Sequence, residues 1–386
     1  MIAPELEQLL RPLESFEEIR RRFVRLGDRV CDLSYANPHE GVAERTRDAL
    51  RETLDDRRLF DLQYSPFGGQ TPARRAVADA LTASHGLSFG FEDVVLTPGA
   101  MAALQLALRS SGEPPNEIIV PVPCWLDYPL YVRYLGLEPV LVPLASHTFS
   151  LDVDAIADAV TERTSAVLFS HPSNPAGRQY DPDALRDLAD ALTRVEERTG
   201  RQITLIVDEA HRDFTAPGSF RSASEIWSRT LIVYSFGKYH FMQGQRIGYV
   251  AVSPNHPRRA HVSRELVRWA RITGFCTPTA LMQRALPRLM SLHHDYSWVT
   301  CWRQRYVEEL SSAGYATLSP DATLFLYVAT PVPQDDFEFV QRLAAAGVLV
   351  LPAPVFHHGG YFRISLTGSE RMLEQALPVL IRCCTT

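Results

Sequence analysis

Residues 231–246 of this chain read LIVYSFGKYHFMQGQR, and they begin as an apolar run typical of a buried β-strand. The run ends at Ser235, and Lys238 follows it as a lone lysine. Arg246 comes eight positions later, with almost no other charge in between. In a mainly parallel α/β sheet, the active site lies at the carboxyl ends of the strands. The stretch therefore predicts a strand that delivers a lysine and an arginine to one polar loop at such an edge.

Similar apolar runs recur along the chain and alternate with stretches of helical spacing. The predicted strands are 94–97, 118–122, 140–143, 166–170, 203–208 and 231–235. One predicted helix begins at Thr71 and stops at Gly86. Another begins at Asp181 and runs towards Gly200. Strands that are apolar throughout and linked by helices predict an α/β fold, with a mainly parallel sheet covered by helices on both faces.

The pattern changes at about residue 278. Beyond it lies a long, Arg-rich helical stretch, followed by β-type runs such as ATLFLYVAT and YFRISL with a helix between them. This order predicts a second, smaller α+β unit. We therefore expect residues 46–277 to form a large domain and residues 278–386 a small domain, to which residues 1–45 also contribute.

The composition is that of an ordinary globular protein of 386 residues, 46% of them hydrophobic. Lys and Arg number 39 against 45 Asp and Glu, and this net charge of -6 argues against nucleic acid or a membrane as the main partner. No apolar run approaches the roughly 18 residues of a membrane span, and no signal peptide is evident, which favours the cytoplasm. The six cysteines lack metal-ligand spacing, so we expect reduced thiols and no metal site. The composition favours small-molecule chemistry.

Polar residues follow several of the predicted strands. Asp208 ends the run ITLIVD, and Asn174 follows AVLFS. The run VVLT turns through Gly99 into a helix. Taken singly, each of these is typical of a helix cap or a turn. Together with Lys238, they predict a cluster of functional groups at one edge of the sheet.

Seven short motifs carry a stronger signal because they occur in a fixed order. They are YSPFGGQTPAR (64–74), TPGAMAAL (97–104), PVPCWLDY (121–128), NPAG (174–177), DEAH (208–211), SFGK (235–238) with Arg246, and YFRISL (361–366). In their order and spacing, the chain resembles the fold-type I pyridoxal-phosphate enzymes of the class I/II aminotransferase family, from about residue 32 to residue 380. The resemblance implies a seven-stranded sheet between helices, pyridoxal 5′-phosphate as the cofactor, and an amino acid as the substrate.

The resemblance also implies roles around the cofactor ring. Lys238 carries the cofactor as a Schiff base and, once released, is the acid/base at the substrate α-carbon. Asp208 pairs with the protonated ring nitrogen, which lets the ring act as an electron sink. Asn174 donates a hydrogen bond to the phenolic oxygen of the ring, and the side chain of Trp125 stacks on the ring face.

A second set of residues is expected to hold the phosphate and the substrate. The phosphate ligands are backbone N–H groups at a helix start, a hydroxyl and a bidentate cation, from Gly99, Ala100, Met101, Ser235 and Arg246. In the family, Tyr64 reaches the phosphate of the neighbouring subunit, which implies a homodimer with shared sites. Arg363 clamps the α-carboxylate of the substrate, and Asn174 and Trp125 also face the substrate.

The chain departs from the family pattern at several positions. His211 stands where the family has a tyrosine that bonds the phenolic oxygen of the cofactor. An imidazole donates the same bond but also titrates near neutral pH, so His211 is either a neutral replacement or a catalytic group that moves protons. Gly237 removes a hydroxyl that the family usually has, and Gln245 replaces an apolar or aromatic residue. Four histidines are also expected near the site: His171, His240, His357 and His358.

Three functions are compatible with these residues. The first is an aminotransferase that moves an amino group between an α-amino acid and a 2-oxo acid. The second is a relative that uses the same carbanion for elimination, replacement, cyclisation or oxidation. The third is a non-catalytic sensor, against which the intact Lys238 and the short segment before the first motif argue. Arg363 specifies a carboxylate, and no residue specifies the side chain of the substrate.

Overall fold

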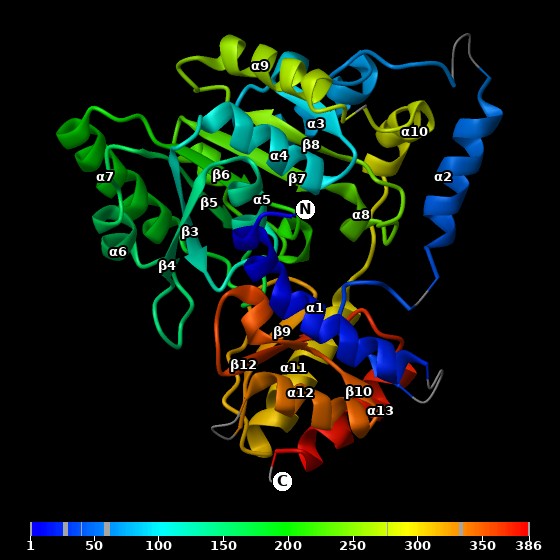
Figure 1. Ribbon diagram of the computed structural model, residues 1–386. Helices are drawn as coiled ribbons and strands as arrows, with labels where there is room; N and C mark the ends of the chain where they lie inside the picture. Colours follow the sequence, from blue (N-terminus) through cyan, green and yellow to red (C-terminus); the bar gives the residue numbers. More distant parts are fainter. Residues whose placement is uncertain are drawn as a thin grey trace.

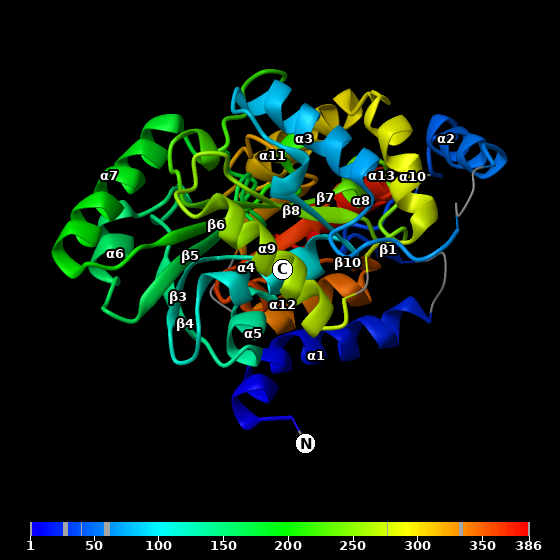
Figure 2. The ribbon, with the colours of Figure 1, turned by 90° about the horizontal axis from the view of Figure 1, so that it is seen from above.

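The chain has two parts, a larger one built on a wide sheet and a smaller one built on a short sheet (Figure 1). The computed structural model describes residues 2–25, 30–39, 41–57, 62–275, 277–331 and 335–384. Its α-helices are α1 (Pro4–Val24), α2 (Glu44–Asp55), α3 (Thr71–His85), α4 (Ala100–Ser111), α5 (Tyr128–Tyr134), α6 (Val153–Asp158), α7 (Pro182–Thr199), α8 (Phe236–Tyr239), α9 (Arg259–Ile272), α10 (Ala280–Met290), α11 (Ser297–Ser312), α12 (Asp336–Ala345) and α13 (Glu370–Arg382). Seen from above, α6 and α7 lie at one end of the larger part, and α2 and α10 lie at the other (Figure 2).

The larger part contains a seven-stranded sheet in the order β2-β8-β7-β6-β5-β3-β4. Its strands are β2 (Val94–Thr97), β3 (Glu117–Val122), β4 (Glu138–Pro143), β5 (Thr164–Ser170), β6 (Thr204–Asp208), β7 (Thr230–Ser235) and β8 (Gly248–Val252). β8 runs antiparallel to β2 and β7, whereas the other neighbours are parallel. The predicted α/β fold with a mainly parallel sheet is confirmed. β8 was not predicted; it follows β7 after residues 236–247 and runs antiparallel to it.

Helices cover both faces of this sheet because successive side chains of each strand point to opposite sides. On β7, Leu231 and Val233 pack in a core that α4, α5 and α9 complete. Ile232 and Tyr234 face the other way and pack with α3 and α10. Every residue of β7 is buried, so its polar end, Ser235, opens directly into the polar loop that carries Lys238.

The smaller part is a three-stranded antiparallel sheet in the order β11 (Leu351–Pro352), β12 (Tyr361–Ser365) and β9 (Phe325–Ala329). Beside it, β1 (Cys31–Asp32) pairs in parallel with β10 (Val348–Leu349), and α1 packs against α12 (Figure 1). α1 also packs against α5 of the larger part, and the contribution of residues 1–45 to the small domain stays a prediction. The predicted division at residues 277 and 278 stays a prediction, and α10, which follows it, packs against α2 and α3 of the larger part.

Candidate active site

A cavity of about 180 Å³ lies at the carboxyl ends of β5, β6 and β7. It is lined by Ala100, Met101, Leu104, Trp125, Tyr128, Ser170, Asn174, Asp208, His211, Ser235, Lys238, Gln243 and Arg246. The strand ends therefore bring together most of the residues that the motifs predicted, from segments far apart in the sequence. Leu104, Tyr128, Ser170 and Gln243 were not predicted.

Asp208 is held in place at the end of β6 by two hydrogen bonds. The hydroxyl of Tyr128 donates to Oδ2 at 3.0 Å, and the backbone N–H of Ala210 donates to Oδ1 at 3.0 Å. Burial raises the pKa of Asp208, while Lys238 and these two donors act in the opposite direction. Tyr128 is the last residue of the motif PVPCWLDY, and that position was the signal that could have identified it.

Lys238 sits in the short helix α8, three residues after the end of β7. Burial lowers the pKa of its amine, which Asp208 partly offsets. The nearby guanidinium groups of Arg246 and Arg363 lower this pKa further. A lysine in such surroundings loses its proton more readily than an exposed one, which makes its amine a better nucleophile.

The start of α4 and the guanidinium of Arg246 form a cradle on one side of the cavity. Gly99 caps α4 with φ of 84°, a left-handed conformation that favours glycine. A Cβ atom on Gly99 would lie 2.7 Å from Nη2 of Arg246, so the guanidinium rests directly on this glycine. Ala100 and Met101 follow as the first residues of α4, whose free backbone N–H groups favour an anion.

Arg363 is buried in the middle of β12 without a carboxylate partner. Its side chain donates from Nη1 to Oδ1 of Asn174 at 3.0 Å and from Nη2 to the carbonyl of Ser34 at 2.8 Å. The guanidinium carbon lies 3.9 Å from the ring centre of Phe325 and 4.9 Å from that of Phe356. Burial lowers the pKa of Arg363 to about 9. Among the residues that the structure describes, no acidic side chain forms an ion pair with it, and its Nε has no hydrogen-bond partner.

His211 lines the same cavity with its side chain free of hydrogen bonds. It is only 3% exposed, and neither ring nitrogen has a partner among the described residues. Its ring lies edge-on to Phe325, with 5.2 Å between the ring centres. Burial holds the pKa of His211 well below its ordinary value, and the positive charges of Lys238 and Arg363 lower it further. The imidazole is therefore neutral at physiological pH.

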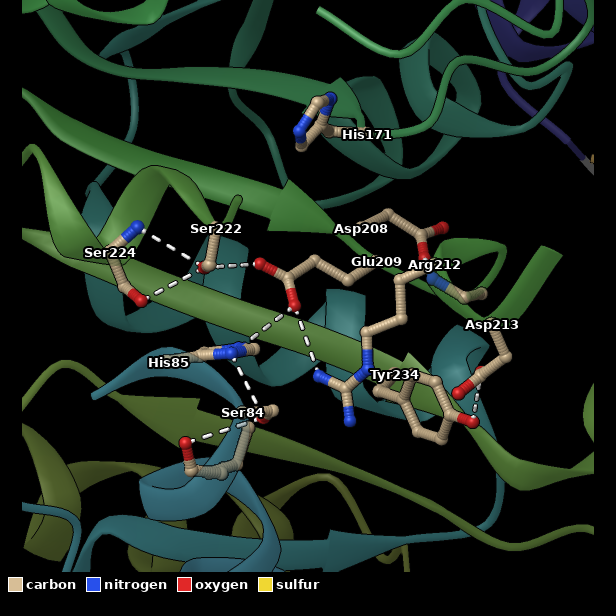
Figure 3. Close-up of polar contacts among 12 residues, drawn as sticks. Ser84, His85, His171, Asp208, Glu209, Arg212, Asp213, Ser222, Ser224 and Tyr234 are labelled. Atoms are coloured by element: carbon tan, nitrogen blue, oxygen red, sulfur yellow. Dashed lines mark hydrogen bonds and ion pairs between the residues drawn. The ribbon is translucent and has the colours of Figure 1, made fainter. Parts of the chain in front are cut away.

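The turn that carries Asp208 is anchored by the buried carboxylate of Glu209 (Figure 3). The Glu209 carboxylate accepts a hydrogen bond from Nη1 of Arg212 at 3.0 Å and lies 3.3 Å from Nε2 of His85. The hydroxyl of Ser222 also donates to it. Burial alone would raise the pKa of Glu209, but these neighbours lower it to about 2. His211 lies two residues after Glu209; its carbonyl accepts a hydrogen bond from the N–H of Phe214 at 3.1 Å, and its ring packs against Phe325.

Several predicted residues lie elsewhere. Tyr64 is fully exposed and does not line the cavity of its own chain, so its contact with a partner subunit stays a prediction. The four additional histidines also have partners outside the cavity. His171 stacks on Tyr180, His240 contacts His294, His357 contacts the carbonyl of Leu126, and His358 contacts Tyr327.

Comparison with known proteins identifies the family. The sequence matches the family described as Aminotransferase class I and II over residues 29–380. The chain belongs to this family. This aminotransferase is 28% identical over 373 residues to the probable aspartate/prephenate aminotransferase of Thermus aquaticus, and the match covers 93% of this chain and 92% of the relative.

Solved structures of other aminotransferases have the same fold. An amino transferase from Eubacterium rectale matches with a TM-score of 0.91 and 25% identity, over 100% of this chain and 99% of the other. A single mutant of aspartate aminotransferase from Thermus thermophilus matches with a TM-score of 0.85 and 26% identity, over 96% of each chain. These comparisons confirm the predicted family and the predicted seven-stranded fold. They also confirm that the protein is an enzyme, an aminotransferase. Enzymes of this family depend on pyridoxal phosphate.

Proposed function

We propose that this aminotransferase binds pyridoxal 5′-phosphate in the cavity at the ends of β5, β6 and β7 and exchanges an amino group between an α-amino acid and a 2-oxo acid. The observation that carries the proposal is the shared cavity itself, which Lys238, Asp208 and Arg246 all line. Arg363 adjoins it through its hydrogen bond to Asn174. No other cavity combines a lysine with a carboxylate and a cation in this way among the described residues.

The chemistry of the lining residues fits this cofactor. A carboxylate at the position of Asp208 suits a protonated ring nitrogen, and the lowered pKa of Lys238 suits attachment to an aldehyde. The guanidinium of Arg246 and the start of α4 at Gly99 suit a phosphate. When bound, the cofactor supplies an electron sink for the bonds at the α-carbon of the substrate.

The side chains of the site have separate tasks in this reaction. Asp208 keeps a proton on the ring nitrogen, and Tyr128 and the Ala210 N–H hold its carboxylate in the orientation that this requires. Lys238 removes and returns the proton at the α-carbon, because its amine is readily deprotonated. Arg363 binds the α-carboxylate, which fixes the α-hydrogen relative to that amine.

The substrate class follows from Arg363. A buried guanidinium without a counter-ion is costly, and a substrate carboxylate would neutralise it with two parallel hydrogen bonds. Two of the similar proteins are named for aspartate and prephenate, both of which carry carboxylates. We propose an α-amino carboxylate as the substrate of this chain, with the nature of its side chain left to a substrate panel.

We further propose that the enzyme works as a homodimer. Large hydrophobic side chains are exposed around the loop that carries Tyr64 and on the neighbouring helix α9, namely Leu62, Tyr64, Phe67 and Ile272. Arg271 of α9 lies over the ring of Phe67, which shows that the loop and the helix form one surface. Such a patch is unusual on a monomer and would be covered by a second copy.

A cytoplasmic location is also our proposal. Among the described residues, no helix is long and apolar enough to cross a membrane. Cys31 and Cys124 are buried free thiols, which supports a reducing compartment.

Reductive trapping tests the cofactor site. Borohydride treatment of the purified enzyme should attach the cofactor covalently to the peptide that contains Lys238, and Lys238→Ala should prevent it. Attachment elsewhere, or none, would refute the proposal. In a separate sample that is not reduced, addition of single amino acids should convert the cofactor to pyridoxamine phosphate, with reversal by a 2-oxo acid. Release of a side-chain fragment without this conversion would contradict amino transfer.

A further inference from the structure

The side chains of His211 and Arg363 both contact the aromatic ring of Phe325. The ring of His211 meets Phe325 edge-on, with 5.2 Å between the centres. The guanidinium of Arg363 lies over the ring of Phe325 at 3.9 Å and has Phe356 nearby at 4.9 Å. An aromatic ring, rather than water, therefore separates the imidazole from the guanidinium. A charge at one position acts strongly on the other, since the space between them has a low dielectric constant.

The charged groups that face His211 come from three elements. Without a cofactor, Lys238 on α8 and Arg363 on β12 both disfavour a proton on the imidazole. When Lys238 carries the cofactor, Arg363 is the free cation that still acts on it. Asp208, at the end of β6, also lines the cavity, but its carboxylate is engaged by Tyr128 and the N–H of Ala210. His211 is thus neutral in the free enzyme because burial and these cations oppose its protonation.

A carboxylate that binds Arg363 changes this balance. It neutralises the charge of Arg363 and adds a negative charge on the same side of the imidazole. Both ring nitrogens of His211 lack partners among the described residues, so either one is free to take a proton. The turn that carries His211 is held through Glu209 by His85 of α3 and by Ser222, and the His211 ring packs against Phe325, so the ring keeps its position while its charge changes.

We propose that His211 binds a proton from solvent more tightly while the carboxylate of a substrate is bound to Arg363, and that this gain is lost when the carboxylate leaves. The proposal rests on the proposed role of Arg363 as the carboxylate-binding residue. When the proton binds, one N–H bond forms on the imidazole, and no other covalent bond changes. The fraction of His211 that is protonated is then higher with substrate bound than without it. A hydroxyl at this position does not do this, because a buried tyrosine stays protonated throughout.

The proposal predicts the size of the effect. Neutralisation of the Arg363 charge should tighten proton binding to His211 by about ten-fold, that is, by about 1.4 kcal/mol. Arg363→Met removes the same charge permanently. In this variant His211 should titrate at higher pH without any ligand, and a carboxylate should cause no further change.

Nuclear magnetic resonance of histidine rings labelled with ¹⁵N tests the proposal directly. The cofactor-loaded enzyme is titrated from pH 5 to 8, alone and with saturating succinate or 3-phenylpropionate, which carry a carboxylate but no amino or oxo group. The signals of His211 are identified by their loss in His211→Asn. We expect the midpoint of His211 to move up by at least one pH unit with ligand. An unchanged midpoint in the ligand-bound enzyme would overturn the proposal.

Calorimetry provides a second measurement and tests the role of Arg363 separately from that of His211. Ligand binding is measured at pH 6.5 in two buffers of different ionisation enthalpy, and His211→Tyr should bind the ligand with less proton uptake than the wild type. If the ligand binds Arg363→Met and Arg363→Gln as tightly as the wild type, the proposed role of Arg363 is wrong. If binding depends on Arg363 while proton uptake is the same in His211→Tyr, only the proposal for His211 is wrong.

Discussion

Replacement of Arg363 by methionine is expected to stabilise the ligand-free enzyme while it abolishes carboxylate binding. Burial lowers the pKa of Arg363 from that of an exposed arginine to about 9. At about 1.4 kcal/mol per pKa unit, this corresponds to roughly 5 kcal/mol of destabilisation by the buried charge. Methionine has a similar length, so it removes the charge without a large cavity. The carbonyl oxygens of Asn174 and Ser34 each lose a donor, at a cost of about 1–2 kcal/mol each. We therefore expect a net gain of about 1–3 kcal/mol.

The pH dependence of this gain follows from the sign of the pKa shift. Because the folded pKa is lower than the unfolded one, the folded state binds the proton less tightly, and the penalty is fully present at every pH below about 9. The penalty shrinks only as the pH rises above about 9 towards the ordinary pKa of an arginine. The difference between Arg363→Met and the wild type should therefore be the same at pH 6 and pH 8.

Urea unfolding, followed by circular dichroism at both pH values and at constant cofactor and protein concentration, measures the stability. Succinate should raise the midpoint for the wild type and leave that of Arg363→Met unchanged. Arg303 supplies the matched control, because it is another buried arginine whose pKa is lowered by burial and which donates to the carbonyl of Thr323. Arg303→Met should keep the response to succinate. A lower midpoint for Arg363→Met than for the wild type, without ligand, would refute the reasoning.

Three further substitutions test the other parts of the site. Glu209→Gln should lower the free energy of unfolding in urea by about 3 kcal/mol at pH 7. Because the pKa of Glu209 is lowered in the folded state, the stabilisation by its carboxylate is present above about pH 4.5 and is lost as the pH falls towards 2. Gly99→Ala should weaken cofactor binding about ten-fold or more in a fluorescence titration, since the new Cβ would meet Arg246 at 2.7 Å with φ of 84°. Tyr128→Phe should lower the rate of amino transfer about ten-fold at unchanged cofactor content, because Asp208 loses a donor and is protonated more easily.

Each of these three predictions has a control or a result that would contradict it. Glu309→Gln is the control for Glu209→Gln, because Glu309 pairs with Arg305 on the surface and should change stability by less than about 0.5 kcal/mol. Equal effects of the two substitutions would show that burial of Glu209 contributes nothing. Unaltered cofactor affinity in Gly99→Ala would mean that the phosphate does not lie at the start of α4. An unchanged rate of amino transfer in Tyr128→Phe would show that the hydrogen bond from Tyr128 to Asp208 is not needed for the reaction.

Local sequence signals predicted much of the fold and several residues of the site. Gly86 and Gly200 end α3 and α7 in left-handed conformations, as a glycine at a helix end indicates. Asp181 caps α7 through a hydrogen bond from the N–H of Asp183. Lys238 and Asp208 were found because a polar residue at the end of an apolar strand stands out in the sequence.

Local patterns along the sequence were enough to predict six of the seven strands of the large sheet, the ends of α3 and α7 and the motif residues, because each depends on neighbours within a few positions. The tertiary structure alone decided how these residues meet. The hydroxyl of Tyr128 reaches Asp208 across 80 residues, and the carbonyl of Ser34 meets Arg363 across 329. Such contacts depend on the order of the strands and on how the two parts pack, which no local pattern contains. The pKa of His211 is likewise lowered by burial and by cations from two other elements, so its protonation depends on the tertiary structure.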